Sequence, residues 1–258
     1  MKYVTMSTIL HKIHRKLLKL RLQPIRVFCL HHVCKQYDGD IMYLCDWMDL
    51  ASFKNRIIEF RKDGYQFISL SEAYKHLKND CIRRKKYAVL TFDDGYKSIE
   101  EVLPWLEEQG IPATLFINGK YLDGKSYREN PKEQYLTYDE LFSLTNPLIE
   151  IGHHGWEHTK VTEMTSAELT ESLEKNIELL SKHPRYVPFW AYTYGVNTNK
   201  INDFLRMNNI VPVLVSGSSN YTGADLVDRE PIFYRDDAKI SMRLCSNKEV
   251  CEKCIYNL

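Results

Sequence analysis

Apolar runs alternate with helix-period segments along almost the whole chain. The apolar runs are "RVFCL", "YQFISL", "YAVLTF", "IPATLFI", "LIEIG", "VPFWAY" and "IVPVLV", and most of them alternate with segments whose apolar residues recur every three or four positions. This alternation is typical of an α/β protein with a largely parallel sheet. It suits a closed barrel and an open sheet equally well, and either architecture places its site at the carboxyl ends of the strands.

The helix-period segments have recognisable ends. Gly64 and Gly110 are expected to stop two of them, and Thr137 and Thr165 are each followed by a glutamate three residues later, which predicts capping boxes. We predict helices over Asp46 to Arg61, from Ser71, over Ile99 to Gln109, after Thr165, and around Ile201 to Met207.

The length suits one large domain. The chain has 258 residues, of which 44% are hydrophobic, so it can bury a sizeable core without a second domain. We expect a basic amphipathic helix over residues 1–25, the main domain over 26–235, and an extension over 236–258 packed on the same domain. The polar stretch from Gly119 to Gln134 indicates an insertion over one end of the fold, and such loops are often lids or binding loops.

The first 37 residues carry no acid, although the net charge of the whole chain is only +1. That balance gives no indication of a nucleic-acid partner. The early basic segment either lies on an anionic membrane surface or closes one side of the fold with a solvated basic face. Charges interrupt it throughout, and it lacks the apolar core and cleavage site of a signal peptide. We therefore expect a cytoplasmic protein, with peripheral membrane contact as the alternative.

The chain has seven cysteines, and an odd number without a signal peptide favours reduced thiols. The tail "CSNKEVCEKC" contains Cys251-x-x-Cys254, with Cys245 before them. A structural zinc site needs four ligands, and no histidine follows His183 to complete one nearby. Free thiols are therefore the preferred interpretation of this tail.

Two adjacent carboxylates, Asp93 and Asp94, follow the strand-like run "YAVL" in "LTFDDGY". The simplest interpretation is a turn in which the aspartates bond nearby backbone N–H groups and Gly95 supplies a positive φ. A divalent cation offers another explanation, because its charge offsets the repulsion between neighbouring carboxylates. One aspartate would bind the metal, and the other, whose lone pairs remain available, would act as a base.

The segment "HHGWEH" places His154 and His158 four residues apart, with His153 beside them. Two imidazoles at this spacing can point to one side if the backbone turns helically. Together with one carboxylate they give three ligands and leave coordination positions open for water and substrate. That arrangement suits Zn²⁺, or Mn²⁺, Co²⁺ and Fe²⁺.

The segments "LTFDDGY" and "IGHHGWEH" resemble the first two motifs of the polysaccharide deacetylase family, the NodB-type carbohydrate esterases, and "GIPATLFI" is similar to the usual continuation. The resemblance covers residues 26–235 and implies a distorted (β/α) barrel. It implies that Asp93 is the general base and that Asp94, His154 and His158 bind a divalent metal, foremost Zn, with Co, Mn, Fe or Ni as alternatives. His153 stands where the family often has Ser or Asn.

The segment "WAYTYG" resembles the third motif of the family, which implies that the backbone around Tyr194 binds the oxyanion. The aromatic rings of Trp190, Tyr192 and Tyr194 are candidates for stacking on sugar rings, although aromatic residues at strand ends are also ordinary core residues. Two residues depart from the motif. Thr193 replaces the usual Pro, and Ala191 stands where many members have an Arg that holds the catalytic Asp, which questions how the pKa of Asp93 is tuned.

The family also uses a histidine as the acid that protonates the leaving amine, commonly near the C-terminus, where this chain has none. The early segment "VFCLHHV" resembles the start of the circularly permuted, poly-N-acetylglucosamine deacetylase-like branch, in which this histidine lies N-terminally. His31 aligns with it, with Leu30 in place of the usual aromatic residue, and His32 is the alternative.

The resemblance implies a metal-dependent hydrolase that removes N-acetyl groups from amino sugars of a capsular glycan, an exopolysaccharide or a precursor. One alternative keeps the metal centre and changes the substrate to O-acetyl sugar esters or small cyclic amides. Another is a degenerate sugar-binding domain, prompted by Ala191, by Thr193 and by the missing C-terminal histidine. The complete set of ligands favours an enzyme, because a binding module would not need it.

Overall fold

The structure is a computed structural model that describes residues 23–35, 47–79, 85–125, 134–216, 220 and 226–231. The predicted basic helix over 1–25 lies outside these ranges apart from its last three residues, and so does the extension over 236–258 with its cysteines. Within the described ranges, no helix has the length and apolar character needed to cross a membrane.

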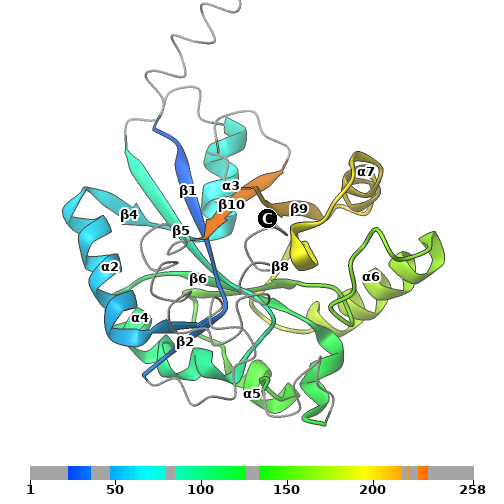
Figure 1. Cartoon of the computed structure of the whole chain (residues 1–258), viewed down its shortest axis with the longest axis horizontal. Coiled ribbons are helices and arrows are strands. Elements are labelled where there is room, and N and C mark those ends of the chain that lie inside the picture. Colours follow the sequence, from blue (N-terminus) through cyan, green and yellow to red (C-terminus); the bar gives the residue numbers. More distant parts are fainter. Residues whose placement is uncertain are drawn as a thin grey trace, which may run out of the picture.

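Ten strands and six α-helices make up the described parts of the chain (Figure 1). The strands are β1 (Ile25–Leu30), β2 (His32–Cys34), β3 (Trp47–Asp49), β4 (Tyr65–Phe67), β5 (Lys86–Phe92), β6 (Ala113–Ile117), β7 (Ile149–His153), β8 (Tyr186–Ala191), β9 (Val211–Val215) and β10 (Val227–Pro231). The α-helices are α2 (Leu50–Lys62), α3 (Leu70–Asn79), α4 (Leu103–Glu108), α5 (Tyr138–Ser143), α6 (Ser166–Leu180) and α7 (Asn199–Met207), with 3₁₀ helices η2 (Lys97–Glu101), η3 (Gly119–Asp123) and η4 (Thr193–Gly195).

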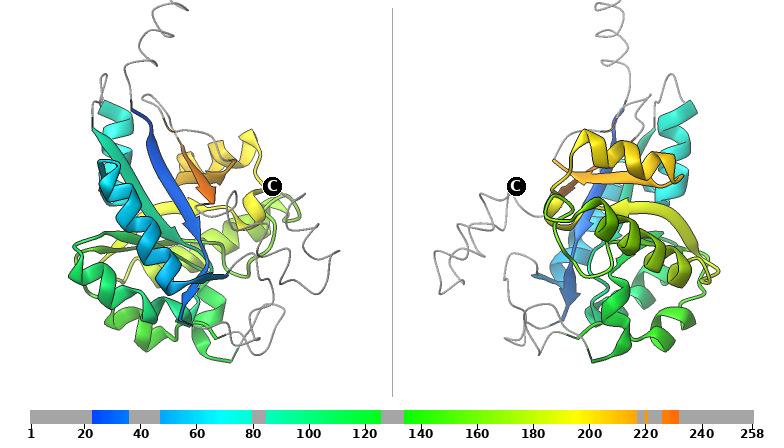
Figure 2. Two further views of the ribbon diagram at one scale, coloured as in Figure 1. Left: turned by 60° about the vertical axis from the view of Figure 1, so that its left-hand side comes forward. Right: turned by 90° about the vertical axis from the view of Figure 1, so that its right-hand side faces the viewer.

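Seven parallel strands close into a barrel. Their order is β1, β10, β9, β8, β7, β6 and β5, and β5 pairs back onto β1 over the whole length of β1. On its other edge, β5 pairs first with β4 and then with β6, so β4 is an eighth strand attached beside the ring. The two side views in Figure 2 show β1 and β5 running together along one wall. The predicted distorted (β/α) barrel is thus confirmed.

Alternate residues of the strands fill the interior of the barrel. Ile25 and Val27 of β1 form a buried cluster with Tyr87 and Val89 of the neighbouring β5 and with Phe116 of β6. Helix α3 contributes three apolar residues to the same cluster, so it closes the amino end of the barrel. These three residues are Leu70, Ala73 and Leu77.

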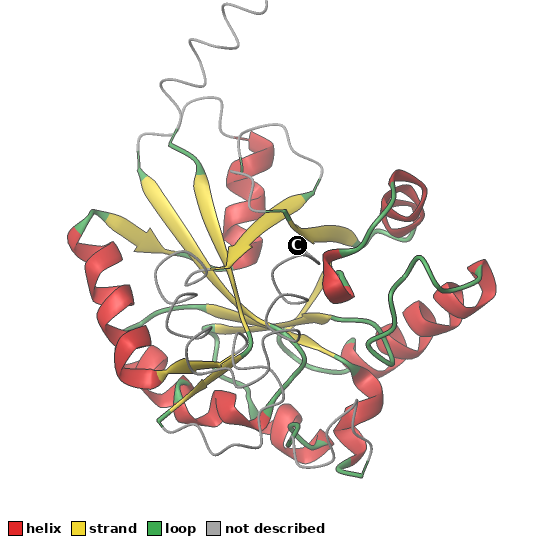
Figure 3. Ribbon diagram, in the orientation of Figure 1, coloured by secondary structure: helices red, strands yellow, loops and turns green. Residues whose placement is uncertain are grey.

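Helices lie around the outside of the strands (Figure 3), and the outward residues of the same strands pack against them. Leu90 and Phe92 of β5 share a buried cluster with Phe53 and Ile57 of α2 and with Leu106 of α4. The two faces of β5 therefore belong to two different cores, as expected for a strand buried on both sides.

One predicted helix begins later than expected. The sequence predicts a helix from Asp46, whereas α2 begins at Leu50 because β3 pairs with β2. The side chain of Asp49 accepts a hydrogen bond from the backbone N–H of Ser52 at 2.8 Å and caps the helix. A capping aspartate favours the non-helical backbone that ends β3.

The predicted helix over Ile99 to Gln109 is interrupted at Val102 and divides into η2 and α4. Pro104, in the first turn of α4, has no N–H to donate to a preceding carbonyl, so it favours a new helix start. Both predicted capping boxes are present, at Thr137 and Thr165. The first residues of the predicted insertion form η3, with Tyr121 and Leu122 buried, and residues 126–133 lie outside the described ranges.

Candidate active site

The carboxyl ends of three barrel strands bring the predicted residues together. Asp93 and Asp94 follow β5, His154 follows β7 with His158 shortly after it, and His31 follows β1. Because these strands are parallel, their carboxyl ends lie at the same edge of the barrel.

The metal ligands implied by the sequence converge on one point. His154 Nε2 lies 3.2 Å from Asp94 Oδ1, and His158 Nε2 lies 3.1 Å from the same oxygen. In a tetrahedral zinc site with ligand distances near 2.0–2.1 Å, neighbouring ligand atoms are about 3.4 Å apart. All three side chains are buried. The donor types and their separations therefore fit a divalent cation.

A hydrogen bond to the backbone fixes the orientation of His154. Its Nδ1 lies 2.9 Å from the carbonyl oxygen of Ala191, which can only accept, so Nδ1 carries the proton. This leaves the lone pair of Nε2 for a metal. The ring of His158 lies edge-on to the ring of Tyr194, with centroids 4.7 Å apart.

Backbone strain concentrates at this site. Asp94, His158 and Tyr194 have φ values of 70°, 52° and 56°, and among the described residues Asn209 is the one other non-glycine residue with a positive φ. Each such residue costs on the order of 1–3 kcal/mol and persists only where its surroundings fix it. Gly95 also has the positive φ that a simple turn requires. The turn expected from "DDGY" is thus present, and its aspartates additionally face histidines.

Asp93 is held by an arginine that sequence reasoning missed. Arg229 of β10 is fully buried, and its Nη1 and Nη2 donate to Oδ1 and Oδ2 of Asp93, the latter at 2.8 Å. Its Nη1 also donates to Thr91 Oγ1 at 3.1 Å, and its Nε donates to the carbonyl oxygen of Leu214 at 3.3 Å. The doubt raised by Ala191 is therefore answered, because another strand supplies the arginine.

The charge of this arginine keeps Asp93 ionised. Burial alone would raise the pKa of Asp93, but the facing Arg229 guanidinium, with smaller contributions from His154 and His31, holds the pKa below its usual range. The same pairing raises the pKa of Arg229 despite its burial. Oδ2 of Asp93 lies 4.0 Å from His154 Nε2, so the carboxylate stands beside the predicted ligand set.

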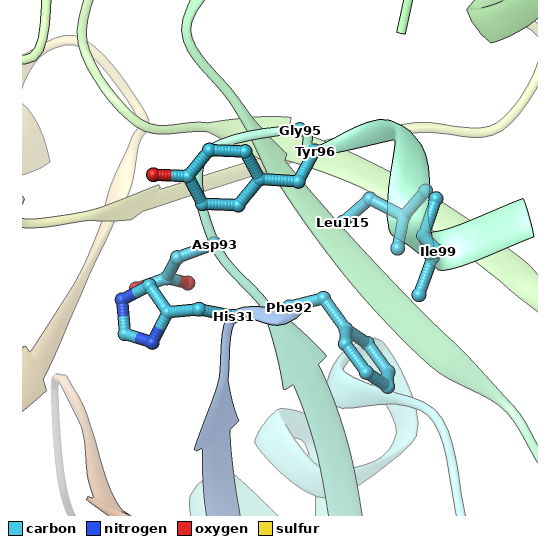
Figure 4. A pocket seen from close by; sticks show the side chains of 7 residues that line it. All are labelled: His31, Phe92, Asp93, Gly95, Tyr96, Ile99 and Leu115. Carbon is cyan, nitrogen blue, oxygen red and sulfur yellow. The ribbon is translucent and has the colours of Figure 1, made fainter. Parts of the chain in front are cut away.

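The two candidate acids, His31 and His32, lie in different environments. The imidazole of His31 lies beside the carboxylate of Asp93 in a crevice that also includes Tyr96 (Figure 4). His32 instead lies in β2, its Nδ1 3.2 Å from Ser98 Oγ and its ring stacked on that of Tyr96 at 3.7 Å. Geometry thus favours His31 over His32 as the residue that can act together with Asp93.

His153 is turned away from the ligands. Its Nε2 lies 2.9 Å from the Tyr186 hydroxyl, and its ring stacks on Trp190 with centroids 5.8 Å apart. Burial lowers the pKa of His153 to about 3, which keeps the ring neutral. Its role in this structure is packing between β7 and β8.

The aromatic residues of the third motif do not share one environment. Trp190 and Tyr192 are both 1% exposed and pack with Leu173 and Leu205, and the Tyr192 hydroxyl donates to Asn202 Oδ1 at 2.7 Å. Neither ring presents a face to a sugar, contrary to the expectation from the sequence. Tyr194, 42% exposed beside His158, does present one.

The threonine that replaces the usual proline makes its own contact. Thr193 Oγ1 donates to the carbonyl oxygen of Thr159 at 2.7 Å. This bond joins the third motif to the residue that follows His158. Proline has no hydroxyl to make this bond. The side-chain hydrogen bond of Thr193 thus restrains the backbone where the ring of a proline would otherwise fix φ.

Comparisons with known proteins identify the family that this chain matches. The family model described as polysaccharide deacetylase matches residues 82–212, just over half of the chain. The chain is 29% identical over 104 residues to YxkH of Bacillus subtilis, a match that covers 40% of this chain and 34% of that protein. It is 22% identical over 167 residues to the poly-beta-1,6-N-acetyl-D-glucosamine N-deacetylase of Escherichia coli, covering 60% of this chain and 25% of that enzyme. The chain thus matches only about a quarter to a third of these curated relatives.

Solved structures share the fold. IcaB from Ammonifex degensii superposes with a TM-score of 0.70 at 19% identity, covering 86% of this chain and 97% of that chain. The Streptococcus pyogenes deacetylase PplD, solved in complex with acetate, superposes with a TM-score of 0.66 at 17% identity, covering 81% and 91%. At these identities the likeness establishes the fold alone, and the family model covers all three sequence motifs. The chain therefore belongs to the polysaccharide deacetylase family.

Proposed function

We propose that this protein is a metal-dependent hydrolase that removes N-acetyl groups from amino sugars of a glycan or glycan precursor. The observation that carries the proposal is the position of Asp93, ionised and clamped by Arg229, beside the three converging side chains of Asp94, His154 and His158. An amide is a poor electrophile, and its hydrolysis needs a base, an activated carbonyl and an acid for the leaving amine. The site offers residues for each requirement.

The three converging side chains would hold the cation. When bound there, a divalent ion polarises a carbonyl oxygen and makes water more acidic. The orientation of His154 is already fixed through its Nδ1, so its Nε2 needs no reorganisation to become a ligand. The buried oxygen, nitrogen and nitrogen donors suit Zn²⁺ best, with Co²⁺, Mn²⁺, Fe²⁺ and Ni²⁺ as alternatives.

Proton transfer is assigned to two side chains on the same side of the barrel mouth. Asp93 accepts a proton from the attacking water, since its carboxylate is ionised and does not belong to the ligand set formed by Asp94, His154 and His158. His31, beside it, donates a proton to the nitrogen of the leaving amine. The amide carbon–nitrogen bond breaks, and the products are acetate and the free amino sugar.

The substrate class is argued from the relatives and from the rim of the site. The Escherichia coli relative is named for N-deacetylation of poly-beta-1,6-N-acetyl-D-glucosamine. Here the exposed ring of Tyr194 stands against His158, where it can stack on a sugar while the acetyl group points inward. An acid that protonates a leaving nitrogen is more important for an amide than for an ester, which favours N-acetyl over O-acetyl groups.

The test measures acetate release from N-acetylglucosamine oligomers and from an O-acetylated glycan, after chelation and after metal is restored. His31→Gln and His32→Gln form a matched pair, because both replace neighbouring histidines with the same residue. We expect metal-restored release from the N-acetyl substrate, a fall of about 100-fold in His31→Gln, the usual size of a general-acid contribution, and a smaller change in His32→Gln. Release from the O-acetyl substrate alone would contradict the N-acetyl assignment.

A further inference from the structure

A second group of potential metal ligands adjoins the site. The Sγ of Cys29, a ring nitrogen of His31 and a carboxylate oxygen of Asp93 all lie within 4.8 Å of one another. Strand pairing brings them together, because Cys29 of β1 is in register with Thr91 of β5, two residues before Asp93. None of the three belongs to the set formed by Asp94, His154 and His158, so the barrel mouth carries two separate donor sets.

The separations and donor types suit a thiophilic cation. Cys29 Sγ lies 3.4 Å from Asp93 Oδ2. In a tetrahedral zinc site, a sulfur and an oxygen ligand are about 3.6 Å apart, given bond lengths near 2.3 and 2.1 Å. Thiolate and imidazole together select Zn²⁺ or Co²⁺ over Mg²⁺ and Ca²⁺, which prefer sites made of oxygen ligands.

The neighbouring arginine weakens this site without blocking it. Arg229 donates to both oxygens of Asp93, but a carboxylate has about four lone-pair positions, so Oδ2 can accept a cation on the side of Cys29. The positive charge of Arg229 opposes a second cation more strongly than it opposes one at the more distant Asp94. The two donor sets should therefore fill in order, with the Asp94 set first.

We propose that Cys29, His31 and Asp93 form a second, weaker site for Zn²⁺ or Co²⁺, and that its occupation inhibits the enzyme. Binding replaces the S–H bond of Cys29 by a sulfur–metal bond and releases that proton to solvent, and the hydrogen bond from Cys29 to Asp93 is lost. A neutral ring nitrogen of His31 and a carboxylate oxygen of Asp93 bind the ion through their lone pairs, so any proton on that nitrogen is released as well. Inhibition follows because the ion occupies the proton-accepting carboxylate of Asp93 and the imidazole of His31 together. The inhibitory part rests on the proposed function, whereas the binding part does not.

The test counts the ions bound by a variant that keeps only the two described cysteines, Cys29 and Cys34, and this variant is the parent protein of the experiments below. The cysteines at 45, 81, 245, 251 and 254 lie outside the described ranges and are replaced by serine, which leaves Cys29 and Cys34. The metal-free protein is then titrated with Co²⁺. We expect two ions per chain, with thiolate-to-cobalt charge-transfer absorption in the second step. Cys29→Ser should bind one ion and lose that absorption.

The matched control is Cys34→Ser, which removes the other buried thiol at a position outside the donor set. It should keep both ions and the charge-transfer absorption. A single ion in the parent protein, or absorption that survives Cys29→Ser and disappears in Cys34→Ser, would overturn the proposal.

Zinc K-edge absorption spectroscopy on the parent protein needs no folded Cys29→Ser variant. The second equivalent of Zn²⁺ should add a sulfur neighbour at about 2.3 Å. Spectra with only nitrogen and oxygen neighbours at two equivalents would refute the site.

Activity separates this inference from the proposed function. In the parent protein, acetate release should rise with the first equivalent of Zn²⁺ and fall by about 100-fold or more with excess, because the general base is lost. Excess Mg²⁺ should cause no such fall. Two bound ions without acetate release from any substrate would refute the proposed function and leave the second site standing. Undiminished release in excess Zn²⁺ would refute the inhibition.

Discussion

The two ends of the barrel interior are built from the same strands, but the amino end is mainly apolar and the carboxyl end carries buried acids and histidines. At the amino end, Ile25 and Tyr87 pack beneath α3, and the one buried acid of β7, Glu150, accepts from Ser71 N–H at 3.3 Å and Thr114 Oγ1 at 3.1 Å. At the carboxyl end, two adjacent aspartates are buried together with histidine nitrogens directed at one of them.

The difference shows which end carries the fold and which carries the chemistry. A buried acid is tolerated when hydrogen bonds satisfy it, as at Glu150. Adjacent buried acids on a strained backbone are unfavourable unless a nearby positive charge offsets theirs, and we propose that a bound cation does so at Asp94. Substitutions at the amino end should therefore change stability, and substitutions at the carboxyl end should change activity.

The largest expected effect comes from Asp94→Asn. Asparagine tolerates the positive φ of this position but removes the charge that binds the cation. We expect activity to fall by about a thousandfold, since metal catalysis supplies several kcal/mol, while the metal-free variant is at least as stable as the metal-free parent. Acetate release and urea unfolding measure the two quantities. A clear loss of stability in the metal-free variant would contradict the comparison.

The same measurements on Glu150→Ala provide the counterpart at the other end. Thr114 Oγ1 would lose its partner, and the N–H of Ser71 would lose its acceptor. We expect a loss of about 1–3 kcal/mol in unfolding free energy, the usual cost of leaving buried polar groups unpaired, with kcat close to that of the parent. A kcat as low as that of Asp94→Asn would mean that the two ends are not separable.

Arg229 joins stability and activity in one residue. Arg229→Ala leaves Asp93 as a buried, unpaired acid, which should cost about 3–5 kcal/mol in unfolding free energy and lower kcat. A second variant moves the arginine to position 191, where many members of the family have the arginine that holds the catalytic aspartate. We expect Ala191→Arg with Arg229→Ala to recover part of the lost activity, and Ala191→Arg alone to destabilise the protein, because position 191 is fully buried. If the double variant is no better than Arg229→Ala, the two positions are not equivalent.

Leu77→Ala tests the closure of the amino end by α3. Leu77 is fully buried in the interior cluster, so truncation should cost about 2–5 kcal/mol in unfolding free energy. The kcat should stay unchanged, because α3 does not reach the barrel mouth. Activity assays well below the melting temperature, with exposed Met207→Ala as control, check this expectation.

The smallest expected effect is a dependence of stability on pH at His183. Burial, the largest cause, lowers the pKa of His183, whose Nε2 lies 3.0 Å from the Leu141 carbonyl oxygen and whose Nδ1 accepts from Arg185 N–H at 3.0 Å. Stability from the neutral ring is thus fully present above the unfolded pKa, about 6.5, and is lost as pH falls towards the lower folded value. Unfolding at pH 7.5 and 5.5 should show the parent losing more stability than His183→Gln. Equal losses would contradict this assignment.

Local motifs made part of the site predictable. Asp93 and Asp94 are adjacent, and His154 and His158 are four residues apart, so the sequence alone revealed them. Arg229 lies 136 positions from Asp93, in a short strand with polar residues on both sides, and no periodicity marks it. Only closure of the barrel by β10 brings it to Asp93.

The fold could be predicted to a similar extent. Alternating apolar runs and capping residues indicated an α/β fold with a largely parallel sheet and most of its helices, whereas the closed barrel was implied only by the family resemblance. The start of α2 was placed too early because the pairing of β3 with β2 is a tertiary interaction. Burial of Trp190 and Tyr192 behind the barrel wall likewise depends on helices α6 and α7, which the motif itself does not report.

The most direct test of the central claim compares Asp93→Asn with the parent at matched metal content. Each protein is loaded with one equivalent of Zn²⁺, the bound ion is counted, and acetate release from N-acetylglucosamine oligomers is measured. The account predicts one ion in both proteins and a fall in kcat of about 100-fold or more in the variant. Unchanged kcat in an Asp93→Asn protein that holds its ion would show that Asp93 is not the base.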